Sequence, residues 1–164
     1  MKKQWDFLKN KFTANQLAHA YLFSGYNVKE IQNFAKEFIR YINCLKPNIK
    51  HCGECHNCKF IEKGIFPDLK IIKSSDSKSS LENETDKLEI DIGQIRDLQS
   101  FLSYKSYYGQ YKCVMIESAE RMNVQAQNCL LKIIEEPKGK TIVILIASKP
   151  DILLPTVSSR CQQI

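Results

Sequence analysis

The sequence predicts an α/β fold, a three-layer domain in which a parallel β-sheet lies between two layers of helices. Short apolar runs alternate along the chain with longer segments whose apolar residues recur every three or four positions. Residues 141–146 form a run made almost entirely of β-branched residues, which is typical of a strand covered on both faces. The repeated order of strand and helix favours parallel strands joined by right-handed crossovers.

The first half of the chain opens with a strand and a helix. A strand is predicted at residues 20–25, an apolar run that ends in glycine. Apolar residues on one face then predict a helix over residues 28–42. After a cysteine-rich interruption, a second strand is predicted at residues 68–73, and the polar residues 74–86 predict a solvated loop.

The second half continues the same alternation. A helix is predicted over residues 92–102 and a strand over 112–116. Asn123 is a suitable N-cap for the next helix, which we expect to end before Pro137. Residues 161–164, after the long apolar strand, predict a last strand.

Composition places the chain among ordinary globular proteins. Its 164 residues fit one domain, with 43% hydrophobic and 26% charged residues. Seven cysteines are too few, and odd in number, for a disulfide scaffold, which indicates a reduced, cytoplasmic setting. The longest apolar stretch is far below the ~20 residues of a membrane-spanning helix, so no membrane partner is expected. The net charge of +6 arises within the first 60 residues, which makes nucleic acid a partner to consider.

Four cysteines have the spacing of a metal site. Cys44, Cys52, Cys55 and Cys58 form C-x7-C-x2-C-x2-C, and four thiolates can complete a tetrahedral Zn²⁺ shell. Four protein ligands leave no position open for water, so this zinc is expected to be structural and not catalytic.

The remaining cysteines and the nearby histidines have simpler interpretations. His51 and His56 flank the cluster; either could replace a cysteine ligand, but exposed loop histidines are the favoured interpretation. Cys113, Cys129 and Cys161 fall within strand or helix patterns and are expected to be buried, small apolar residues.

The first strand and helix lie where a P-loop would be, but the phosphate-binding residues are missing. The pattern G-x-x-x-x-G-K-[ST] counted from Gly25 puts Glu30, Ile31 and Gln32 at its last three positions. Glutamate repels phosphate, isoleucine carries no charge, and glutamine lacks the hydroxyl that binds Mg²⁺. A shifted alignment that uses Lys29 is no better, since Glu30 follows it. Little ATP binding is therefore expected.

The end of the third strand lacks a second catalytic feature. An ATPase would have Asp-Glu there, one carboxylate for Mg²⁺ and one to activate water. Here the strand is followed by Glu117 and Ser118, with Glu120 further along. The carboxylate that activates water is therefore absent.

Several motifs, in order, resemble one known family. The chain is similar to subunits of the bacterial DNA polymerase III clamp loader, of the AAA+ class with its RecA-like, P-loop NTPase-like domain, and in particular to the delta-prime type. The resemblance rests on residues 17–25, the four-cysteine module with residues 66–68, residues 90–96, residues 117–122, residues 128–137 and residues 158–161.

The resemblance implies a role in replication without ATPase activity. Arg160, in the Ser-Arg-Cys motif, would reach into the ATP site of a neighbouring subunit as an arginine finger. Ser148 would match a polar sensor residue, although a role in capping the next turn is favoured. Implied partners are the gamma/tau and delta subunits, and, through the assembled complex, the sliding clamp and primer-template DNA.

Family members of full length also have a helical lid domain and a C-terminal helical collar. Residues 1–164 are therefore expected to be the AAA+ α/β domain alone, with the zinc module 44–58 inserted after its first helix.

Two alternatives remain open. One is an ATP-binding clamp-loader ATPase of the gamma/tau type with a divergent P-loop. The other is a stand-alone nucleic-acid binder built on the zinc module, which the mixture of tyrosines and lysines in residues 104–112 favours.

Overall fold

The computed structural model describes residues 2–48, 50–74 and 89–164. Its centre is a five-stranded parallel sheet with the strand order β2-β3-β4-β1-β5. All five predicted strands are present, at Ala20–Ser24 (β1), Leu69–Ile72 (β2), Lys112–Ile116 (β3), Thr141–Ala147 (β4) and Gln162–Gln163 (β5). The predicted three-layer α/β class is confirmed.

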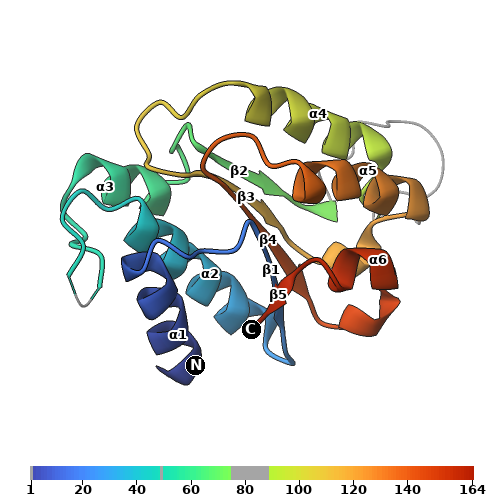
Figure 1. The fold of residues 1–164 in the computed structure, drawn as a ribbon, viewed down its shortest axis with the longest axis horizontal. Helices are drawn as coiled ribbons and strands as arrows, with labels where there is room; N and C mark the ends of the chain where they lie inside the picture. Colours follow the sequence, from blue (N-terminus) through green and yellow to red (C-terminus); the bar gives the residue numbers. More distant parts are fainter. Residues whose placement is uncertain (1, 49, 75–88) are drawn as a thin grey trace.

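The helices cover both faces of the sheet (Figure 1). One layer holds Lys2–Thr13 (α1), Val28–Ile42 (α2) and His56–Glu62 (α3), and the opposite layer holds Ile92–Ser103 (α4), Val124–Glu135 (α5) and Pro155–Ser158 (α6). Short 3-10 helices lie at Ala119–Arg121 (η3) and Pro150–Ile152 (η4). None of the helices in the described part of the chain is long and apolar enough to cross a membrane.

The two cores follow from the alternation of side chains along the strands. Leu22, Val114 and Leu145 face α4 and α5, whereas Tyr21 and Ile144 face α1 and α2. Every residue of β4 is buried, as its run of β-branched residues predicts.

The predicted helix starts are built by side-chain caps. Asn123 caps α5 by accepting a hydrogen bond from the backbone N–H of Ala126 at 2.9 Å. Asp91 and Gln94 form a reciprocal capping box at the start of α4. The predicted loop at residues 74–86 lies outside the described residues beyond Ser74.

Three α-helices of the described chain were not predicted: α1, α3 and the short α6. Helix α1 buries Leu8, and its Trp5 and Phe12 rings pack edge-on against Tyr41 of α2. The spacing of Trp5, Leu8 and Phe12 was a usable signal, although charged residues surround it. Helix α3 begins inside the cysteine module, where Cys55 is its N-cap.

A buried polar cluster joins the module to the amino end of the sheet. The Asp68 carboxylate accepts hydrogen bonds from the backbone N–H groups of Tyr107, Tyr108 and Gly109 at 2.6–2.7 Å. Asn43 accepts from the N–H of Tyr111 at 2.9 Å. A Cβ on Gly109 would lie 2.6 Å from Oδ1 of Asn43, so this position has room for glycine alone.

Candidate functional site

The four predicted cysteines come together in space. The Sγ atoms of Cys44, Cys52, Cys55 and Cys58 all lie within 4.8 Å of one another. A tetrahedral zinc ion with Zn–S bonds of ~2.3 Å holds its sulfurs about 3.8 Å apart, so a small inward movement would complete the shell. The donor set and its spacing therefore fit a metal ion.

Backbone amides along the knuckle stabilise the thiolate forms. The N–H groups of Cys52, Cys55 and Cys58 point at the sulfurs of Cys44, Cys52 and Cys55 at 3.3, 3.4 and 3.5 Å. The N–H of Cys55, followed by that of Glu54, lowers the pKa of Cys52 to about 6. Burial raises the pKa of Cys44 and of Cys58, so metal binding near neutral pH would release protons from these two thiols.

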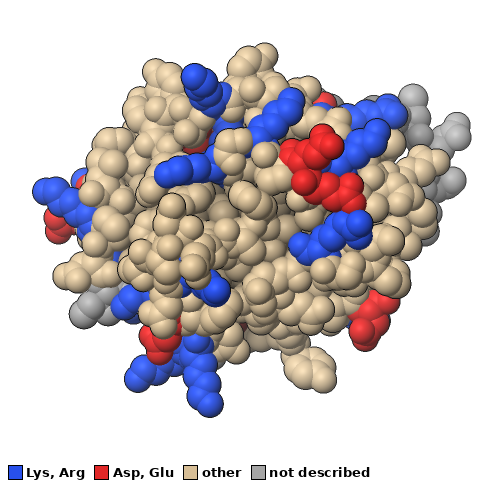
Figure 2. All heavy atoms as spheres, viewed as in Figure 1, with Lys and Arg blue, Asp and Glu red and all other residues tan. Residues whose placement is uncertain are grey.

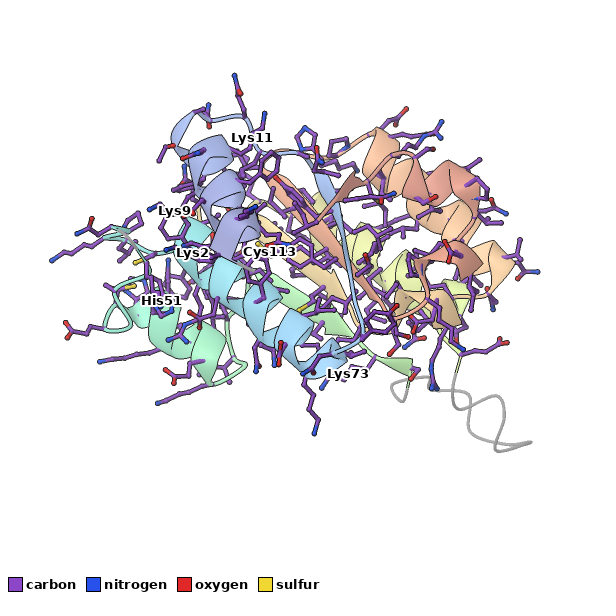
Figure 3. The ribbon with its side chains drawn as sticks, turned by 90° about the horizontal axis from the view of Figure 1, so that it is seen from below. Lys2, Lys9, Lys11, His51, Lys73 and Cys113 are labelled. Carbon is purple, nitrogen blue, oxygen red and sulfur yellow. The ribbon has the colours of Figure 1, made fainter. Side chains whose placement is uncertain are left out.

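Charged groups attach the module to α2. His51 Nε2 lies 2.8 Å from Oε2 of Glu37, and Arg40 contacts Glu37 at 3.1 Å and Glu62 at 3.4 Å. Figure 3 shows His51 between the cysteine module and α2. The interpretation of His51 as an exposed loop residue is wrong, because its side chain is 13% exposed and contacts Glu37.

The other histidine and the remaining cysteines have structural surroundings. The His56 ring packs against Phe60 and Tyr108 at centroid distances of 6.1 and 5.3 Å, within α3 and not in a loop. Cys113 and Cys161 are buried as predicted, whereas Cys129 is half-buried.

The connection from β1 to α2 is short and internally bonded. Only residues 25–27 separate the strand from the helix. Asn27 accepts from the N–H of Glu30 at 3.3 Å and donates to its carboxylate at 2.7 Å. Glu30 also lines a hollow of about 200 Å³ at this turn, whereas Lys29 does not. The backbone N–H of Glu30, which could otherwise donate to a phosphate, is thus already bonded to the side chain of Asn27 in the same turn.

Acidic groups lie beyond the carboxyl ends of β3 and β4. Glu117, the residue after β3, is buried, and its Oε2 lies 3.9 Å from Nζ of Lys73. Glu120 Oε1 accepts hydrogen bonds from Oγ and N of Ser148 at 2.5 and 3.3 Å. The favoured role of Ser148 as a turn cap is wrong: η4 has Lys149 at its N-cap and no side-chain cap bond, because Ser148 is directed at Glu120.

Arg160 lies at the opposite end of the parallel strands from Gly25. It is in the turn before β5, a strand that starts beside Tyr21 near the amino end of β1, whereas Gly25 follows the carboxyl end of β1. The guanidinium is half-exposed; its Nε lies 2.7 Å from Oε1 of Glu135, and Nη1 donates to the carbonyl of Thr156 at 3.1 Å. Sequence reasoning did not find Glu135 as its partner.

A family model described as "DNA polymerase III, delta subunit" matches residues 1–164. The chain belongs to this family. Among curated relatives it is 38% identical to DNA polymerase III subunit delta' of Pseudomonas aeruginosa over 90% of its length, and 35% identical to that of Bacillus subtilis over 94%. It is 34% identical to subunit tau/gamma of Haemophilus influenzae over 95%. It spans 43%, 44% and 21% of the three relatives, respectively.

Solved structures support the same fold. A DNA polymerase III gamma subunit-related protein of Thermotoga maritima superposes with a TM-score of 0.65 at 23% identity, covering 96% of this chain and 44% of that one. The RuvB branch migration motor of the same organism gives a TM-score of 0.54 at 12% identity over 99% of this chain and 42% of its own. These matches show that the chain shares the fold of these proteins.

Proposed function

We propose that this chain is the AAA+ domain of a delta-prime-type subunit of the bacterial DNA polymerase III clamp loader. In this role it completes a ring that loads the sliding clamp on primed DNA, and it donates Arg160 to the ATP of a neighbouring subunit. The position of Arg160 carries the proposal. Its half-exposed guanidinium lies at the opposite end of the strands from its own β1–α2 turn and cannot serve that turn, but a phosphate on another chain could replace Glu135 as its partner.

The β1–α2 turn supports a subunit that does not itself hydrolyse ATP. The three-residue connection gives few free amides for a triphosphate, and the Glu30 carboxylate would repel one. Ser118 follows Glu117 where an ATPase has a second carboxylate, and the nearby Glu120 is held by Ser148. This degenerate P-loop is therefore part of the proposal, with no ATP bound by the chain itself.

The cysteine cluster supports a structural zinc ion. All four donors are thiolate-forming, so a bound ion would have no open position for substrate or water. Its contribution would be to fix the segment between α2 and α3, which otherwise has little apolar core.

The proposal extends to assembly. Gamma/tau and delta subunits are the proposed partners, and the clamp and primer-template DNA would be contacted through the complete complex, in the cytoplasm. Residues 1–164 are proposed to be followed by a helical lid and a collar, as the partial coverage of the relatives is consistent with a longer chain.

A second candidate is a gamma/tau-type ATPase, which the 34% identity to the tau/gamma relative favours. A calorimetric titration with ATP and Mg²⁺, at concentrations up to millimolar, distinguishes the delta-prime-type subunit from the gamma/tau-type ATPase. We expect no saturable binding, and no difference between the native protein and Lys29→Ala. Saturable binding that Lys29→Ala abolishes would replace the proposal by the ATPase.

A further inference from the structure

A hollow rich in lysine lies at the amino end of the sheet, opposite the strand ends that carry Gly25 and Glu117. Its volume is about 450 Å³, and it lies between the end of α4, the α4–β3 connection and the turn before β4. We call it the basic hollow; it is lined by Leu102, Ser103, Tyr104, Lys105, Ser106, Gln110, Lys112, Lys138, Gly139 and Lys140. Four of these residues are lysines, and none is acidic.

Lys112 lies at the base of the basic hollow and is 6% exposed. Its ammonium donates to the carbonyls of Phe101 and Tyr104 at 2.6 and 2.8 Å and lies 4.5 Å from the centre of the Phe101 ring. An ammonium has three donors, so one remains for a ligand. No carboxylate within 4 Å neutralises this buried charge among the described residues, and burial lowers the pKa of Lys112.

The other three lysines form the rim. Lys105, Lys138 and Lys140 are exposed, and none has a salt bridge to the described part of the chain. Figure 2 shows Lys and Arg side chains gathered on this face, over the α4–β3 and α5–β4 connections. Like charges around one concavity repel each other, and an anion within it relieves that repulsion.

The α4–β3 loop, which carries Lys105, is fixed from both ends. Lys112 donates to the carbonyl of Tyr104 at its start, and the Asp68 carboxylate accepts from three successive N–H groups, those of Tyr107, Tyr108 and Gly109. Residues 104–106 are therefore held in place by buried groups, so a ligand would not have to order them.

Tyr104 adds a ring to the charged rim. Its side chain is 74% exposed, and Lys112 lies 5.8 Å from the ring centre. By contrast, Tyr107 and Tyr108 pack on each other, and Tyr108 also packs on α3. Tyr107 is as exposed, at 76%, but Tyr104 is the tyrosine of this loop that lines the basic hollow beside the lysines.

We propose that the basic hollow binds the phosphate backbone of single-stranded nucleic acid and that Tyr104 stacks on one of its bases. Proteins that bind single strands usually combine lysines that contact the phosphate backbone with aromatic rings that stack on unpaired bases. The volume suits about one nucleotide and does not admit a duplex. The inference goes beyond the clamp-loader role and uses neither Arg160 nor nucleotide hydrolysis, so either can fail alone.

The test is fluorescence anisotropy of a labelled dT12 strand with the purified, folded protein between 50 and 200 mM KCl. The double variant Lys138→Gln, Lys140→Gln should weaken binding about tenfold or more and reduce its salt dependence. A matched pair at the end of α3, Lys59→Gln with Lys63→Gln at the C-cap, has the same charge change on exposed residues and should leave the affinity within about twofold. Thermal melting checks that both variants remain folded.

Two further probes separate base stacking from charge alone. Tyr104→Ala should weaken dT12 by about fivefold or more and leave an abasic 12-mer unchanged. Equal losses in the two lysine pairs, or no binding of dT12 at 50 mM KCl, would overturn the proposal. If Tyr104→Ala weakens the binding of dT12 and of the abasic strand equally, Tyr104 does not stack on a base. If an acidic peptide binds more strongly than dT12, the ligand of the hollow is not nucleic acid.

Discussion

The guanidinium of Arg160 is paired with the carboxylate of Glu135, with 2.7 Å between Nε and Oε1. Both side chains are nearly half-exposed, so water screens the pair and its contribution is small. The pair holds Arg160 against the end of α5 within its own subunit. A finger that acts on a neighbour must leave Glu135, at a cost of about 1 kcal/mol or less.

Loss of the Glu135 carboxylate should therefore release Arg160 for the proposed contact with a neighbouring subunit. Glu135→Gln is expected to leave the ATPase rate of the assembled loader unchanged or to raise it, by about fivefold at most. Glu136→Gln, a neighbouring exposed residue, is the control. A fall in ATPase rate with Glu135→Gln alone would show that the pair positions Arg160 and does not restrain it.

Asp68 should be among the most sensitive positions for stability. Asp68→Ala leaves the N–H groups of residues 107–109 without their acceptor, and we expect the free energy of unfolding to fall by about 3 kcal/mol or more. Asp97→Ala, at an exposed position of α4, should change it by less than about 0.5 kcal/mol. Urea unfolding followed by circular dichroism measures both, and equal effects would contradict this role of Asp68.

Metal content tests the cysteine cluster. The protein should carry one zinc ion per chain, and Cys58→Ser should lose it, whereas Cys129→Ser should keep it. Removal by a chelator should speed amide hydrogen exchange in residues 44–62 and leave β4 protected, because β4 lies in the main core. Full zinc content in Cys58→Ser, measured by atomic absorption, would contradict the assigned ligands.

Cys113 gives a dependence of stability on pH. Burial raises its pKa to about 12 in the folded protein, whereas the ordinary value is 9.0. The unfolded chain therefore loses the thiol proton first, and stability that is complete below pH 9 falls as the pH rises, by about 1.4 kcal/mol per pH unit. Cys113→Ala should remove this part of the slope. Identical slopes for the two proteins in urea titrations from pH 8 to 10 would contradict it.

The sequence predicted those features that depend on residues close together in the chain. The strands and the longer helices bury regular apolar faces, and the cysteine ligands lie close together in the chain, so periodicity and spacing sufficed. Helix α1 was missed because lysines surround its three buried residues, and α3 because the cysteine spacing suggested a loop.

Contacts between residues far apart in the chain could not be predicted in this way. Glu135 and Arg160 come from the ends of two different helical segments, and Ser148 meets Glu120 only because β3 and β4 are neighbours. The basic hollow likewise combines lysines from the α4–β3 loop and the turn before β4. These contacts depend on the order of strands in the sheet, which apolar periodicity does not determine.

The decisive experiment for Arg160 measures the ATPase rate of the assembled clamp loader, with DNA and clamp, when this subunit alone carries Arg160→Ala. We expect a fall of about tenfold or more at the neighbouring site, with partial recovery in Arg160→Lys and normal assembly by gel filtration. An ATPase rate equal to that of the native complex would contradict the proposed arginine finger.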